Sequence, residues 1–132
     1  MNHSIKPQRQ FPYYLKYAAH FPITPNTIFV FKNTIYTDNE MPYDINYHEN
    51  IHILQQNKIG AKKWINNYIK DKDFRLAQET EAYRAQLKFV LKETKDRKEY
   101  ANILVECASN LSSPLYGKLV SYPEAIKILR LN

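Results

Sequence analysis

The sequence predicts a mainly α-helical protein with a small N-terminal β-hairpin, an α+β fold. From residue 44 onward, apolar residues recur at steps of three and four, the spacing of one face of an α-helix. Before residue 44, the strong strand signals are two short runs rich in β-branched and aromatic residues. The chain of 132 residues suits a single domain. Within it we expect an irregular arm at 1–26, a hairpin at 27–37 and a helical core at 44–132.

The arm and the hairpin differ in composition. The arm holds four of the seven prolines and an aromatic stretch at 11–17, which predicts an ordered, irregular segment or one short helix. The strand runs at 27–31 and 34–37 are joined by Lys32-Asn33, which can form a tight turn. Two strands alone are marginally stable in water, so the hairpin must pack on helices. Either strand is a candidate edge for binding an extended peptide.

Helix signals define five segments after the hairpin. The first begins at Asp44, a plausible N-cap, and ends at Gly60, which can adopt a left-handed conformation. Its apolar face is expected to contain Tyr47, Ile51 and Leu54. The others are expected at 62–70, 73–93, 96–110 and after Ser121 or Tyr122, with a loop at 111–119.

Charge and composition restrict the function. The net charge of +6, from 19 basic and 13 acidic residues, suggests nucleic-acid binding, but the basic residues are scattered and alternate with acidic ones, as on a solvated surface. No apolar run approaches the roughly 18 residues of a membrane helix, and residues 1–10 carry no secretory signal. We therefore expect a cytoplasmic protein that binds no membrane and for which nucleic acid is the least favoured partner.

Cysteine usage restricts any metal site. Cys107 is the only cysteine of the chain. A single thiol forms no internal disulfide and leaves too few thiolates for a cysteine-based metal site. Any metal must therefore be bound by histidines and carboxylates.

The main chemical signal is a His-Glu-x-x-His motif at residues 48–52. Residues four apart on a helix lie one turn apart on the same face, so His48 and His52 can bind a single zinc ion. Glu49 then lies beside the metal, where it can act as general base toward water acidified by zinc. Simple frequencies predict about 0.007 chance occurrences of this motif in such a chain, so chance is a weak explanation. The alternative is that the two histidines simply pack on a partly buried helix face.

A catalytic zinc site also needs a third protein ligand and an open position. The helix predicted at 73–93 can supply the ligand if it packs antiparallel to the motif helix. Either Glu79 or Glu81 could then face the ion, and spacing alone does not choose between them.

Peptide hydrolysis further benefits from a donor to the developing oxyanion. Tyr83, Arg84 and Tyr116 are candidates for this role. Tyr116 lies in a Ser-Pro-Leu-Tyr-Gly loop whose composition predicts a fixed turn that can form one wall of a cleft. We therefore take Tyr116 as the candidate catalytic residue.

The two motifs resemble the gluzincin type of metallopeptidase, in particular small bacterial and phage proteins whose core reads His-Glu-x-x-His-x-x-Gln, followed by a Glu-x-Glu-Ala helix. The matching residues, within 43–90, are His48, Glu49, His52, Gln55, Glu79, Glu81 and Ala82. The resemblance implies that Glu79 is the third zinc ligand and that Glu81 lies behind the ligands or on the surface. Many of those proteins have Asp after the Ala, where this chain has Tyr83.

Three functions follow from these observations. The leading hypothesis is a zinc-dependent hydrolase, a metallopeptidase acting on a peptide or protein substrate. The second is a zinc-stabilised, non-catalytic structural or interaction protein, such as a phage component, and the third is a basic nucleic-acid-binding domain. Glu49 favours the first over the second, because a purely structural site needs no carboxylate beside its first ligand.

Overall fold

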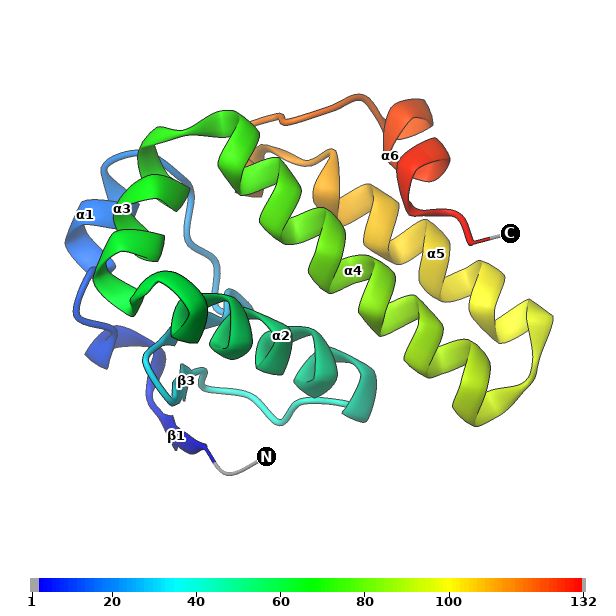
Figure 1. The fold of residues 1–132 in the computed structure, drawn as a ribbon, viewed down its shortest axis with the longest axis horizontal. Helices are drawn as coiled ribbons and strands as arrows, with labels where there is room; N and C mark the ends of the chain where they lie inside the picture. The colour runs from blue at the N-terminus through cyan, green and yellow to red at the C-terminus, as the bar shows by residue number, and fades with distance from the viewer. Residues whose placement is uncertain (1–2, 132) are drawn as a thin grey trace.

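The structure is a computed structural model that describes residues 3–131. It is mainly helical with a small sheet near the N-terminus, as the sequence predicts (Figure 1). The described helices are α1 (Tyr14–Ala18), α2 (Tyr43–Ile59), α3 (Ala61–Lys70), α4 (Lys72–Thr94), α5 (Arg97–Leu111) and α6 (Tyr122–Leu129), with 3-10 turns η1 (Gln8–Gln10) and η2 (Pro114–Tyr116).

The sheet has three strands in the order β1-β3-β2. The predicted hairpin is confirmed: β2 (Phe29–Phe31) and β3 (Thr34–Tyr36) pair antiparallel. The arm was expected to be irregular or to form one short helix, but it also contains β1 (Ser4–Lys6), which pairs parallel with β3. Its three exposed residues carry no strand signal of their own, and their pairing with β3 defines the strand. Either hairpin strand was a candidate edge for binding a peptide. The alternative in which β3 is the edge is wrong, because β3 lies between β1 and β2, and β2 is an edge of the sheet.

Local signals set most helix boundaries. Gly60 ends α2 at a φ of 97°, a backbone conformation that favours glycine. The side chains of Asp71, Asp96 and Ser121 accept hydrogen bonds from backbone amides at the starts of α4, α5 and α6. Asp44 does not cap α2, because the N-cap position falls on Pro42 and Asp44 lies inside the first turn.

The buried face of α2 is not the apolar face that the sequence predicts. Tyr47 and Leu54 are each 42% exposed, whereas His48, His52 and Ile53 are buried. A hydrophobic pattern identifies a core-facing side only when the core is apolar. Here α2 turns its polar motif inward against α4, and this contact is the main packing of both helices.

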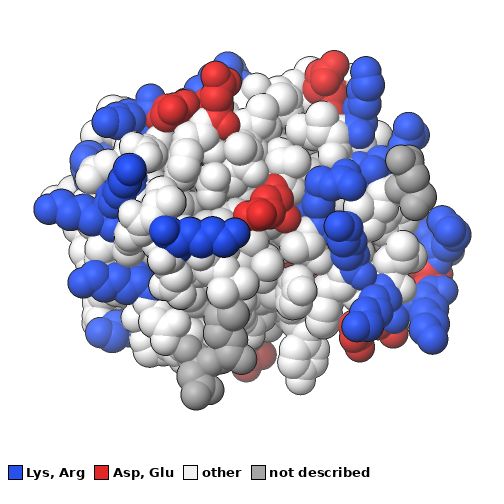
Figure 2. Space-filling model, in the orientation of Figure 1, with Lys and Arg blue, Asp and Glu red and all other residues white. Residues whose placement is uncertain are grey.

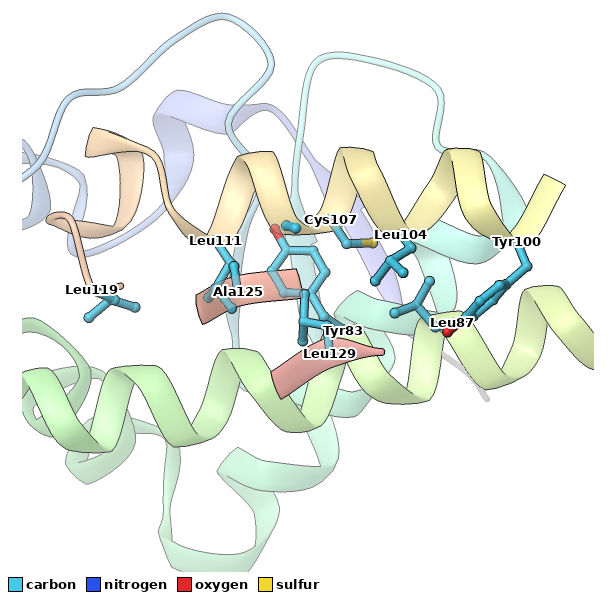
Figure 3. Packing of buried hydrophobic residues seen from close by; sticks show 10 residues of the cluster. Tyr83, Leu87, Tyr100, Leu104, Cys107, Leu111, Leu119, Ala125 and Leu129 are labelled. Atoms are coloured by element: carbon cyan, nitrogen blue, oxygen red, sulfur yellow. The ribbon is translucent and has the colours of Figure 1, made fainter. Parts of the chain in front are cut away.

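Two large hydrophobic clusters form most of the apolar core, and a small third cluster joins Val30, Ile35 and Ile53. The first joins α4, α5 and α6 around Leu87, Leu104, Leu111 and Leu129 (Figure 3). The second is aromatic, and it packs the N-terminal arm and β2 against α3 through the residues Phe11, Tyr17, Phe21, Phe29, Tyr36, Trp64 and Tyr68. Among residues 3–131, no helix is both long and apolar enough to cross a membrane.

Candidate metal centre

Two neighbouring helices bring three potential ligands together. His48 and His52 lie one turn apart on α2, and the Glu79 carboxylate of α4 lies between them. One carboxylate oxygen is 3.1 Å from His48 Nε2 and the other is 3.2 Å from His52 Nε2. One ligand atom from each residue falls within 4.8 Å of the others, and all three side chains are buried. These residues form a candidate metal centre.

A glutamine fixes the orientation of His52. Gln55 Nε2 donates to the Gln78 carbonyl at 3.1 Å and to Glu81 Oε1 at 2.7 Å, so its Oε1 must be the atom that faces the histidine. That oxygen is 2.7 Å from His52 Nδ1. An amide oxygen only accepts, so His52 carries a proton on Nδ1 and presents Nε2 to the centre.

His48 is held in the same way from the other side. Gln86 Nε2 donates to Asp44 Oδ2 at 2.8 Å, which leaves Gln86 Oε1 facing His48 Nδ1 at 3.0 Å. His48 therefore also carries its proton on Nδ1. The amide of Gln86, backed by Asp44, provides the hydrogen bond that commonly orients a metal-bound histidine.

This arrangement requires a positive charge at its middle. With Nδ1 protonated, each neutral imidazole points a lone pair at the ionised Glu79, and such a group is stable only around a cation. Without metal, protons fill that role. Burial opposes charge on both partners, but the charge and hydrogen bond of Glu79 raise the pKa of His52 to about 9. His52 and His48 in turn hold the pKa of Glu79 well below its usual range. Two imidazole nitrogens and one carboxylate are the donor set of a catalytic zinc site, so these residues fit the predicted ion.

Glu49 completes the motif without joining the ligands. Its side chain is only 9% exposed and lines the same cavity as the histidines. Within residues 3–131, no side chain or backbone group forms a hydrogen bond to its carboxylate. Burial raises the pKa of Glu49, and the neighbouring His48 and His52 partly oppose that rise. The carboxylate is thus available to exchange a proton with a molecule in the cavity.

Three tyrosines surround Glu79 and the cavity. Tyr68 donates to Glu79 Oε2 at 2.6 Å, and the hydroxyls of Tyr83 and Tyr116 lie 2.7 Å apart. Burial, reinforced by the charge of Glu79, raises the pKa of all three phenols, so they keep their protons. The buried Arg75 positions Tyr116, because its Nε donates to the Tyr116 carbonyl at 2.9 Å.

All five residues predicted for the site line one cavity of about 330 Å³: His48, Glu49, His52, Glu79 and Tyr116. The alternative ligand Glu81 is exposed and receives a hydrogen bond from Gln55 instead. Arg84 lies outside the cavity lining and donates to the Ile128 carbonyl, which ties α6 to α4.

The sequence interpretation missed the supporting residues of the site. Gln86 lies seven positions after Glu79, two turns along the same face of α4, so helical spacing could have identified it. Asp44 was assigned to capping instead. Tyr68 and Arg75 carry no local signal, because only the packing of α3 and η2 brings them to Glu79 and Tyr116.

We expect Gln86→Leu to weaken zinc binding by about 10- to 100-fold, because His48 loses the acceptor that fixes its ring and tautomer. The measurement is a competition titration against a fluorescent zinc chelator. Lys88→Leu, at an exposed position of the same helix, is the matched control and should bind zinc like the wild type. Equal affinity in both variants would show that the amide does not orient the ligand.

Cys107 is expected to react slowly with alkylating reagents. The thiol is 2% exposed, and burial together with the charges of Asp44 and Glu106 raises its pKa to about 12. Alkylation requires the thiolate, so at pH 8.5 iodoacetamide should label the native protein at least about tenfold more slowly than the urea-unfolded chain. The raised pKa also means that this group stabilises the fold less as the pH rises above about 9. Equal labelling rates would contradict the buried position.

Comparison of the chain with family models, with curated proteins and with solved structures found no match.

Proposed function

We propose that the protein is a zinc-dependent hydrolase, and specifically a peptidase, in which His48, His52 and Glu79 bind the metal and Glu49 is the general base. The observation that carries this proposal is the buried Glu49 carboxylate, which has no hydrogen-bond partner in the described chain and lines the same cavity as three convergent ligand atoms. A purely structural metal site would have no use for a carboxylate that opens into the cavity beside its ligands.

The roles of the residues follow from their surroundings. Zinc bound at this centre would act as a Lewis acid that acidifies water and polarises a carbonyl. Glu49 accepts the proton of the attacking water, and its raised pKa suits it to return that proton to the leaving amine. Tyr68 donates a hydrogen bond to Glu79, which keeps the carboxylate oriented toward the histidines.

The tyrosine pair supports the predicted role of Tyr116. The two hydroxyls of Tyr83 and Tyr116 share one hydrogen bond, which uses one of their two protons. The other proton remains available to an oxygen in the cavity that both side chains line. The pair can therefore donate a hydrogen bond to the oxyanion that forms when a peptide carbonyl is attacked.

The edge strand supports an extended peptide as substrate. Gln56 Nε2 donates to the Val30 carbonyl at 2.8 Å, so Val30 turns its backbone polar groups away from β3 and toward α2. Gln56 Oε1 accepts from Lys32 N at 2.8 Å, which closes the turn end of this edge. Because Gln56 already occupies the Val30 carbonyl and the Lys32 amide, a peptide strand can pair only with the part of this edge before Val30, where Ile28 and Phe29 line the cavity.

The test compares metal content with activity. Wild type and Glu49→Gln are purified without added metal, zinc per chain is measured by elemental analysis, and both are incubated with a broad peptide library read by mass spectrometry. Zinc in both proteins, with cleavage reduced about 10³-fold by the substitution, is the expected result. Glu93→Gln, at an exposed site, should cleave like the wild type. Zinc without cleavage would favour a structural metal site, and the absence of zinc would refute both.

A further inference from the structure

The charge of the cavity is opposite to that of the whole protein. The chain has 19 basic residues and a net charge of +6, and basic side chains are spread over the face shown in Figure 2. Within the described part of the chain, however, no Lys or Arg lines the cavity. Its carboxyl groups are those of Asp44, Glu49, Glu79 and Glu106. The interior therefore favours cations although the exterior favours anions.

Two of these carboxylates lie apart from the metal ligands. Asp44, in the first turn of α2, and Glu106, on α5, both line the cavity together with Cys107. Burial and the charges of both carboxylates raise the pKa of the Cys107 thiol. Asn110, one turn after Glu106 on α5, also lines the cavity. The wall beside α5 is therefore acidic, whereas the lining at 22–28 carries no charge.

Neither carboxylate is neutralised by the protein. Among residues 3–131, neither Asp44 nor Glu106 takes part in an ion pair. Asp44 accepts a hydrogen bond from the neutral Gln86 through Oδ2, and Glu106 is exposed at the rim and receives no hydrogen bond from the described residues. A divalent ion would balance the charges of Glu79 and Glu49, which leaves the two charges of this wall without a counterion.

We infer that this acidic wall selects substrates with an ammonium or guanidinium group close to the scissile bond, and that Glu106 determines this specificity. This inference rests on the proposed function, because the bound molecule is a substrate only if the protein is a hydrolase. The Glu49 carboxylate opens into the same cavity and has no hydrogen-bond partner among residues 3–131, which points to a ligand in this cavity. Glu106 contributes charge without holding the site together, whereas Asp44 also supports His48 through Gln86. Glu106 is therefore the residue on which specificity can be tested separately.

The test measures binding, so that it does not depend on hydrolysis. Zinc-loaded Glu49→Gln protein is titrated by fluorescence with acetylated, amidated hexapeptides of Ala, Ser and Leu that carry one Arg at each position in turn, and with a matching set in which citrulline replaces Arg. Citrulline keeps the shape of the side chain but not its charge. In at least one position, Arg should bind about fivefold more tightly than citrulline, since Glu106 is partly solvated. A third set with a free N-terminus distinguishes a terminal ammonium from a side chain as the cation.

Variants in the same Glu49→Gln background assign the preference to the wall. Glu106→Gln should bring the Arg-to-citrulline ratio close to one, and Glu106→Lys should reverse it. Glu99→Gln, at an exposed position of α5 outside the cavity, should leave it unchanged. Equal binding of both peptide sets, or no binding of either, would overturn the inference, as would a preference that survives Glu106→Gln. Preferential binding of Arg peptides, with no cleavage by the wild-type protein, would refute the hydrolase but leave the cationic selectivity standing.

Discussion

Zinc is expected to raise the unfolding temperature of the metal-free protein by about 15 °C when its free concentration is about 1,000 times the dissociation constant. A ligand that binds only the folded state at this ratio adds about 4 kcal/mol to the free energy of unfolding. For a chain of this size, each kcal/mol raises the midpoint by about 4 °C. Zinc is expected to bind only the folded state because Glu79 is 31 positions from His48, so the three ligands converge only after folding.

The matched variants separate ligation from catalysis. Glu79→Gln keeps the shape of the side chain and an acceptor for Tyr68, but it removes the charge between the histidines, so zinc should no longer stabilise this protein. Glu49→Gln retains all three ligands and should show the full shift. The measurement is differential scanning fluorimetry in EDTA and in zinc buffered by a chelator. An undiminished shift in Glu79→Gln would place the metal elsewhere.

The second large effect concerns the core behind the site. Leu87→Ala is expected to lower the free energy of unfolding by about 2–5 kcal/mol, because it removes buried methyl groups and leaves a cavity. Leu87 is 0% exposed and packs where α4 meets α5, in contact with the cluster around Leu104 and Leu111 (Figure 3). Urea unfolding followed by circular dichroism in EDTA measures the change without any contribution from metal.

Leu15→Ala is the matched control, since the same side chain is 83% exposed on α1. Its effect should stay within about 0.5 kcal/mol. If the two substitutions were equally mild, the helices α4, α5 and α6 would not pack as described. If both were severe, Leu15 would be covered in solution.

Much of the fold was predictable because it depends on local chemistry. The hairpin follows from two β-branched runs around a two-residue turn, and the start of α5 follows from Asp96, which caps it. The strand β1 was not predictable, since its three residues become a strand only by pairing with β3, thirty positions away. The inward face of α2 was also missed, because apolar periodicity points to an apolar core and here the buried face is polar.

In the candidate site, too, some features follow from local sequence and others only from tertiary packing. The His-Glu-x-x-His spacing by itself determined that His48 and His52 share one face of a helix with Glu49 beside them, because a helix fixes such relations within one turn. Only the tertiary structure decided that Glu79 rather than Glu81 lies between the histidines, and that Gln86, Tyr68 and the acidic wall of α5 surround them. Those positions depend on how α4 is rotated against α2 and on which helices pack behind it. Such rotations follow from the fit of many side chains at once, and no local pattern in the chain encodes them.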